Sequence, residues 1–256
     1  MNIIVVSSPQ AQVGKTTIAN FCGLKATSST LLLEMGKLGY SPYIHGTVNA
    51  SEKRSISRVM INPSSLKDNL FQTSNKYLRF CSMNVVEDIM RLNLPNVQVG
   101  EIMEEASKVF NNLIIDTSSD LHSGVNKTIF TKEFREEYNI NDVVVIDENI
   151  ATFKALSDFN EILKSRDLTI RPIIVINKCQ SYEDYMKAFL NKLSNIKPAK
   201  IIPLNNIPEM VYYLNNGEVD VEDKEVDKFR AGIDTLLEQV EKFKIKKEFV
   251  LKEFLM

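Results

Sequence analysis

The residues that most clearly could form a functional site lie in a short run near the start of the chain: Gly14, Lys15, Thr16 and Thr17. An apolar run over 3–6 precedes them and a helical pattern follows them. A strand, a tight loop and a helix in this order leave free backbone N–H groups and the positive end of the helix dipole facing an anion. Lys15 would place its charge on the terminal phosphates, and Thr16 would offer a hydroxyl to Mg²⁺. The sequence therefore predicts a phosphate-binding loop.

This loop departs from the full phosphate-loop pattern, which has Gly at the position of Pro9. A Gly-Lys-Thr triplet alone arises by chance in roughly one in ten chains of this length at average residue usage. A lysine in an ordinary surface turn is therefore the alternative interpretation. The position of the triplet directly after the first apolar run favours the phosphate site.

A second candidate site ends the apolar run 113–115, which is followed by Asp116 and Thr117. A carboxylate at the end of a buried strand can hold Mg²⁺, directly or through water. Acidic residues follow many strands, so Asp116 indicates a metal site only in combination with the loop at Lys15. We expect Thr16 and Asp116 to bind the metal, and Lys15 and Asp116 to take part in catalysis.

A third candidate site follows the apolar run 173–176, where Asn177 can both donate to and accept from the edge of a base. Guanine-specific proteins of the Asn-Lys-x-Asp type carry an Asp three residues after the Asn. The residue at that position here is Gln180, which favours adenine. An Asn177 that merely ends a strand is the alternative.

The elements that must position these residues alternate along the chain. Short runs rich in β-branched residues predict strands at 3–6, 31–33, 77–80, 113–115, 143–146, 173–176 and 201–202. Helical patterns lie between them at 16–25, 98–110, 125–138, 151–165 and 181–194. This alternation predicts the α/β class, with a doubly wound, mostly parallel sheet and helices on both faces. We expect one domain over 1–256, in which 36–75 has no sustained period and holds moving parts.

Composition narrows the functional classes. Lys plus Arg number 31 and Asp plus Glu 33, which gives a net charge of −2. A chain without excess positive charge is not expected to bind DNA. The three cysteines, Cys22, Cys81 and Cys179, are too few and too far apart for a disulfide framework, which indicates a cytoplasmic protein. No run reaches the roughly 18 to 20 apolar residues that span a bilayer.

The C-terminal part predicts a long helix over 222–256. Apolar residues recur at helical spacing from Val226 to Val240, which favours packing of 222–243 on the sheet. The tail 241–256 holds five Lys and three Glu, a net charge of +2, beside eight apolar residues. Contact with an anionic membrane surface is one interpretation of this tail. Its apolar residues fall on two helical faces, so docking on a partner or on a dimer mate is the other.

Taken together, these residues resemble the deviant phosphate-loop ATPases of the MinD/ParA superfamily, which position plasmids, division sites, pili and flagella. The matching segments are the loop 9–17, the strand end 31–34, Asp116, Asn177, and 201–204 with 211–217. The resemblance implies ATP or ADP with Mg²⁺, a nucleotide-dependent homodimer and a protein partner of unknown identity. It also implies nucleotide contacts from Gln10, Gln12, Val13, Gly14, Lys15, Thr16, Thr17, Asn177, Pro203 and Leu204.

Three departures from the family pattern concern hydrolysis. Gln10 replaces the signature lysine that reaches a partner's phosphates, and Glu34 is not followed by the second acid of the first switch. Asp120 stands where the second switch has Gly. Since charge neutralisation and water positioning supply most of phosphoryl-transfer catalysis, we expect slow hydrolysis. Glu34 or Asp120 taking over the water-orienting role is the open alternative, and altered loops of this kind resemble the atypical CpaE/TadZ-like pilus-localisation members.

We therefore expect a dimerising, ATP-responsive positional switch with weak intrinsic hydrolysis, cytoplasmic or held at the inner face of the membrane. Bound nucleotide would set the shape of 36–75 and 117–124 and so the choice of partner. The alternative is a pseudo-ATPase scaffold that binds nucleotide weakly or not at all, which the run from Pro9 to Gln12 favours.

Overall fold

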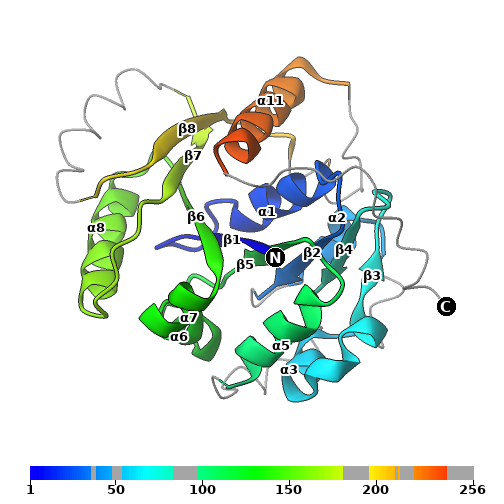
Figure 1. Ribbon diagram of the computed structural model, residues 1–256. Helices are drawn as coiled ribbons and strands as arrows, with labels where there is room; N and C mark the ends of the chain where they lie inside the picture. The colour runs from blue at the N-terminus through cyan, green and yellow to red at the C-terminus, as the bar shows by residue number, and fades with distance from the viewer. Residues whose placement is uncertain are drawn as a thin grey trace.

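In the computed structural model one sheet of eight strands organises the described residues, in the order β3-β4-β2-β5-β1-β6-β7-β8 (Figure 1). Every pair in it is parallel except β3 and β4. The structure describes residues 1–35, 39–47, 54–82, 97–180, 196–210, 213 and 222–240. The predicted α/β class and the mostly parallel sheet are confirmed.

The predicted strands all form. The strands are β1 Asn2–Ser7, β2 Thr30–Glu34, β3 Phe71–Gln72, β4 Leu78–Cys81, β5 Asn112–Asp116, β6 Asn139–Ile146, β7 Ile173–Cys179 and β8 Lys200–Asn205. β3 was not predicted, because two residues are too short for a sequence period and only their pairing with β4 makes them a strand.

The described helices follow the predicted pattern with one split, and two more form within 36–75, where no helix was predicted. They are α1 Lys15–Leu24, α2 Ser41–Ile44, α3 Ile56–Ile61, α5 Val97–Ser107, α6 Gly124–Ile129, α7 Lys132–Glu137, α8 Ile150–Lys164 and α11 Lys224–Gln239. Two 3₁₀ turns, η2 Pro63–Ser65 and η3 Lys67–Asn69, follow α3. The single helix predicted over 125–138 is wrong: Thr131 interrupts it and caps α7 by accepting from the Phe134 N–H. The helix predicted over 181–194 lies outside the described residues.

Helices cover both faces of the sheet. Alternate strand residues point to opposite sides, so Ile3 and Val5 join one core cluster while Ile4 and Val6 join the other. The first cluster includes side chains of α3, α5, α7 and α8, and the second includes side chains of α1, α2 and α11. In Figure 1, α1 and α11 lie above the sheet and α5, α6 and α7 lie below it. The prediction of helices on both faces is confirmed.

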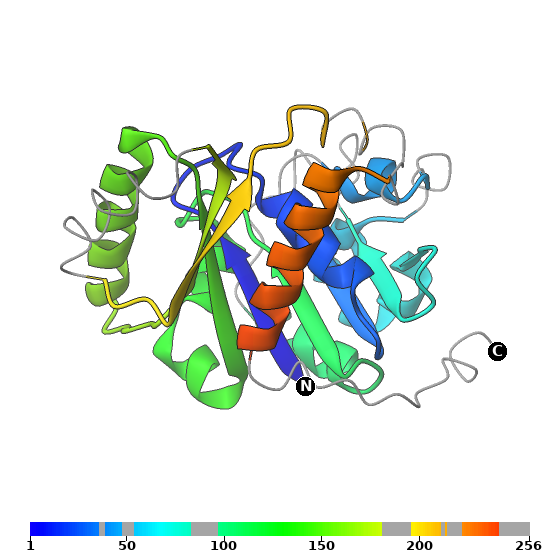
Figure 2. The same ribbon diagram turned by 90° about the horizontal axis from the view of Figure 1, so that it is seen from above.

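The helix α11 packs on β8, as its apolar stripe predicts, and also lies beside α1 (Figure 2). Val226, Phe229, Ile233 and Leu236 are buried, and the ring of Phe229 meets that of Phe21 edge-on at 5.1 Å. The predicted continuation over 241–256 lies outside the described residues. Within the described part of the chain, no helix combines the length and the apolar character that crossing a bilayer requires.

Candidate functional site

The candidate residues meet at the carboxyl end of the central strands. β5 lies between β1 and β2, and the parallel registers place Val6 and Glu34 on either side of Asp116. The loop after β1 and the strand ends of β2 and β5 therefore share one edge of the sheet. In doubly wound sheets this edge is where ligands bind.

The loop between β1 and α1 turns by means of two residues in the left-handed region, Gln12 with φ 62° and Gly14 with φ 93°. Gly14 is the N-cap of α1 and provides no side-chain cap, so the first N–H groups of α1 are left for another acceptor. A Cβ atom at position 14 would lie 2.2 Å from Nδ2 of Asn177. Glycine is thus required here for both backbone conformation and space.

Two residues at the end of β7 hold this loop. The side-chain amide of Asn177 is buried and donates to the Val13 carbonyl at 2.8 Å. The ammonium of Lys178, a residue with φ 58°, donates to the Gln12 carbonyl at 3.1 Å. Sequence reasoning placed Asn177 at a base and gave no role to Lys178. The structure shows both side chains bound to the phosphate-loop backbone, and a basic residue next to Asn177 was the available signal.

Lys15, Thr16 and Asp116 come together below the loop. The Thr16 hydroxyl donates to Oδ2 of Asp116 at 2.5 Å, and Lys15 is 9% exposed. Burial lowers the pKa of Lys15, while the charge of Asp116 opposes that change. Burial, followed by the charge of Glu34, raises the pKa of Asp116 to about 7. These perturbed pKa values in one enclosed cluster are typical of a functional site.

One oxygen atom of this cluster is suited to bind the predicted metal ion. Oδ1 of Asp116 is buried and has no hydrogen-bond partner in the part of the chain that the structure describes. A buried carboxylate oxygen without a partner is costly, and a bound cation would remove that cost. Together with the Thr16 hydroxyl it provides the oxygen ligands that Mg²⁺ prefers.

Glu34 lies beside Asp116 but has a different environment. It is fully buried, and its carboxylate accepts hydrogen bonds from the N–H groups of Tyr40 and Ser41 and from the Ser82 hydroxyl, at 2.8, 3.0 and 2.6 Å. Burial raises its pKa, against the effect of these three donors. These contacts anchor α2 on Glu34. The catalytic role of Glu34 stays a prediction.

The side chain of Gln10 is bound to α8. Its side-chain oxygen accepts from the Thr152 hydroxyl at 2.7 Å, in the first turn of α8, and its backbone N–H donates to Ser8. Asp120, the other departure from the family pattern, turns its carboxylate back to the His122 N–H at 2.9 Å. Gln10 is a neutral amide and Asp120 an acid, so neither side chain can neutralise a phosphate.

A pocket of about 620 Å³ opens over the start of α1. Pro203 and Leu204, predicted as nucleotide contacts, are not among its lining residues. Leu204 is 1% exposed, and a Cβ atom at Gly232 of α11 would lie 2.3 Å from its side chain. The pocket is lined instead by the loop before α1, by α1 and α2, by the segment after β5, by the ends of β7 and β8 with the segment after β8, and by α11: Ala11, Gln12, Gly14, Lys15, Thr16, Thr17, Tyr40, Tyr43, Ile44, Thr117, Ser118, Ser119, Asp120, Asn177, Lys178, Asn205, Asn206, Ile207, Met210 and Phe229.

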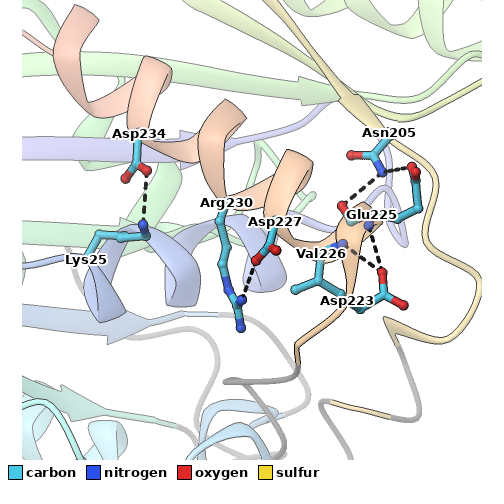
Figure 3. A network of polar contacts seen from close by, with 8 residues as sticks. All are labelled: Lys25, Asn205, Asp223, Glu225, Val226, Asp227, Arg230 and Asp234. Carbon is cyan, nitrogen blue, oxygen red and sulfur yellow. Dashed lines mark hydrogen bonds and ion pairs between the residues drawn. The ribbon is translucent and has the colours of Figure 1, made fainter.

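The β8 side of the pocket is tied to α11 (Figure 3). The Asn205 amide donates to the carbonyl and the carboxylate of Glu225, while Asp223 caps the first turn of α11. Further along α11, Asp234 pairs with Lys25 at 3.0 Å. These contacts fix α11 relative to both β8 and α1.

Comparison with known proteins places this architecture in a structural class. No family model and no curated protein matches the sequence. A plasmid partition protein of Borrelia burgdorferi B31 bound to AMPPNP is similar in structure, with a TM-score of 0.74, 12% identity, and coverage of 93% of this chain and 99% of that one. The cell division ATPase MinD of Pyrococcus furiosus has a TM-score of 0.72, 14% identity and coverage of 93% and 98%.

The MinD cell division protein of Aquifex aeolicus has a TM-score of 0.67 and 18% identity, again covering 93% of this chain and 98% of that one. The chain thus has the fold of the phosphate-loop ATPases. Within that class, its structural neighbours are ATPases of the MinD/ParA type, so the predicted resemblance is confirmed at the level of fold.

Proposed function

We propose that the chain is an ATP-binding positional switch of the MinD/ParA type with slow intrinsic hydrolysis. The observation that carries this proposal is the cluster of Lys15, Thr16 and the unpartnered Oδ1 of Asp116 beneath a loop whose helix has no side-chain cap. The similarity to a partition protein solved with AMPPNP supports it.

In this proposal different residues of the chain bind the phosphates and the metal ion. The first N–H groups of α1 and the ammonium of Lys15 bind the phosphates, and Thr16 with Asp116 holds Mg²⁺. The metal, when bound, neutralises charge that develops on the phosphates. Val13 and Gly14 shape the loop, and Asn177 and Lys178 keep its backbone in place.

We expect slow hydrolysis because two groups are missing from the site, a positive charge at position 10 and an acid that orients water. The neutral side chain of Gln10 is bound to Thr152, and the carboxylate of Glu34 is enclosed. Neither can supply the charge or the water orientation on which phosphoryl transfer depends. We expect less than about one turnover per minute without a partner, against about ten per second for an ordinary enzyme.

The proposal includes a nucleotide-dependent homodimer and a protein partner. A complex between MinC and the MinD of Aquifex aeolicus is among the similar structures, at 17% identity and a TM-score of 0.69. For the tail 241–256 we expect docking on a protein surface, since its apolar residues fall on two helical faces. Vesicle co-sedimentation should then pellet the full chain and a 1–240 truncation equally, and preferential pelleting of the full chain would indicate membrane binding.

Isothermal titration calorimetry with Mg²⁺ and ATP tests the proposal. Lys15→Ala should abolish binding, while the matched control Lys164→Ala should leave it unchanged, because Lys164 is an exposed residue paired with Glu161 on α8. If the wild-type chain gives no heat with ATP or ADP, the switch is refuted and the pseudo-ATPase scaffold replaces it.

A further inference from the structure

The pocket over the start of α1 is lined by aromatic and aliphatic side chains as well as by charged ones. Tyr40 and Tyr43 both line it, although they are 48% and 49% exposed. In the described residues only Ile61 of α3 is an equally exposed large hydrophobic residue, and it does not line the pocket. Two of the three such side chains therefore stand together at the mouth of one pocket.

The aromatic and aliphatic walls of the pocket come from two elements that flank α1. α2 follows β2 on one side of β1 in the sheet, and α11 packs on β8 at the other side. Tyr40, Tyr43 and Ile44 line the pocket from α2, while Ile207, Met210 and Phe229 line it from the β8 and α11 side. Thr16 and Thr17, in the first turn of α1, lie between the two walls.

Buried polar contacts hold the backbone of α2 in place although this helix has only four residues. Glu34 accepts from the N–H groups of Tyr40 and Ser41. Asn20 of α1, which is fully buried, donates to the Ser41 hydroxyl at 3.1 Å and lies 2.9 Å from Nε2 of His45. A wall that is fixed before the ligand arrives loses little freedom on binding.

The lining of the pocket combines two kinds of side chain. Lys15, Asp120 and Lys178 are charged, whereas Tyr43, Ile207 and Met210 are aromatic or aliphatic. A nucleoside triphosphate also combines the two kinds of chemistry, since its phosphates are charged and its base is flat and aromatic. The volume of about 620 Å³ lies within the roughly 300–1,000 Å³ typical of small-molecule sites.

We infer that Tyr40 and Tyr43 bind the base and ribose of the nucleotide, with the ring of Tyr43 stacked on the base. This inference rests on the proposed function and adds to it the residues that hold the adenosine end. Stacking on an aromatic ring contributes roughly 1–3 kcal/mol per base and accepts every base, because each base has a π face. The tyrosines therefore set the affinity for the nucleoside, and they do not choose between adenine and guanine.

Calorimetry with two ligands separates the base from the phosphates. Mg²⁺ with ATP probes the contacts to both, and Mg²⁺ with inorganic tripolyphosphate probes the phosphate contacts alone. We expect Tyr43→Ala and Tyr40→Ala each to raise the Kd for ATP about tenfold, which corresponds to about 1.4 kcal/mol, and to leave the Kd for tripolyphosphate unchanged. Tyr43→Phe and Tyr40→Phe keep the ring and should bind ATP within about twofold of wild type.

Ile61→Ala is the matched control, because it removes a side chain with the same 49% exposure outside the pocket. It should change neither Kd. Since the chain has no tryptophan, Tyr43→Trp also provides a single reporter at the proposed position. Its fluorescence should change on addition of ATP and stay constant on addition of tripolyphosphate.

The outcomes distinguish this inference from the proposed function. Wild-type affinity for ATP in both alanine variants overturns the inference and leaves the proposed function standing. Equal weakening of ATP and tripolyphosphate also overturns it, since the tyrosines would then only support the fold of the loop. If the wild-type chain binds neither ligand, the proposed function fails and the inference fails with it.

Discussion

Glu34 and Asp116 occupy the same register position on the neighbouring parallel strands β2 and β5, and both are almost fully buried. Their hydrogen bonds differ. Three protein donors satisfy Glu34, whereas Oδ1 of Asp116 has no partner among the described residues. One acid of the pair thus serves the structure of α2, and the other remains open to a metal.

Replacement of Asp116 by Asn should stabilise the ligand-free chain at pH 8. The pKa of Asp116 rises from 3.8 to about 7 in the folded state, so the folded chain binds more protons than the unfolded chain between about pH 4 and pH 7. Stability therefore falls as the pH rises through this range, and Asp116→Asn removes a cost of at most about 4 kcal/mol.

Urea unfolding of both chains at pH 4 and pH 8 measures this effect. The advantage of Asp116→Asn should be largest at pH 8 and shrink toward pH 4. Calorimetry on the same variant should show the loss of Mg²⁺-dependent ATP binding. Equal stability of the two chains at pH 8 would mean that the buried carboxylate carries no such cost.

Glu34→Gln tests whether this acid orients water or only anchors α2. The N–H groups of Tyr40 and Ser41 bind different oxygens of the carboxylate, and an amide keeps only one of these acceptors. We therefore expect destabilisation of about 1–3 kcal/mol and an intact fold. ATP affinity and the slow turnover rate should remain within about twofold of wild type. A hundredfold or greater fall in phosphate release, measured under single-turnover conditions, would instead make Glu34 a catalytic residue.

Gly14→Ala should destabilise the chain by about 2–4 kcal/mol and abolish ATP binding. The new Cβ atom meets Nδ2 of Asn177 at 2.2 Å, and φ of 93° is strained for any residue with a side chain. Gly100→Ala is the control, because this helical glycine of α5 has nothing within 4 Å of its added Cβ atom. It should raise stability by up to about 1 kcal/mol. Thermal melts of both variants compare the two sites, and equal melting temperatures would contradict the close packing of Asn177 on the loop.

His45 should make stability fall as the solution becomes acidic. Burial lowers its pKa from 6.5 to about 4, so the unfolded chain binds more protons than the folded chain between these values. Stability due to the neutral ring is present above about pH 6.5 and is lost as the pH falls toward 4, by at most about 3 kcal/mol.

His45→Gln should remove this contribution, because the amide can still bond to Asn20 but does not titrate. The measurement is the difference in unfolding free energy between wild type and variant at several pH values from 4 to 8. A difference that stays constant over this range would show that His45 titrates normally in the folded chain.

Several features follow from the sequence because they depend on neighbours in the chain. The strands 3–6 and 113–115 are apolar at every position, as burial on both faces of a parallel sheet requires. The stripe from Val226 to Leu236 predicts the buried face of α11 for the same local reason. Gly14, Lys15 and Thr16 predict the phosphate-binding loop because the turn and the start of the helix lie within a few residues of one another. The split of the helix predicted over 125–138 also has a local cause, because Thr131 is a capping residue that the sequence shows.

Only the tertiary structure decided what the remaining residues do, because register between distant strands decides which strand ends meet. Asn177 binds Val13 across 164 positions of sequence, and Asp116 lies beside Thr16 across 100. The exposed tyrosines of α2 reach the pocket only because Glu34 and Asn20, from two other elements, hold that short helix against α1. Residue types can predict a strand end or a loop, but the partner of a buried polar group is known only once the packing brings it within hydrogen-bond distance.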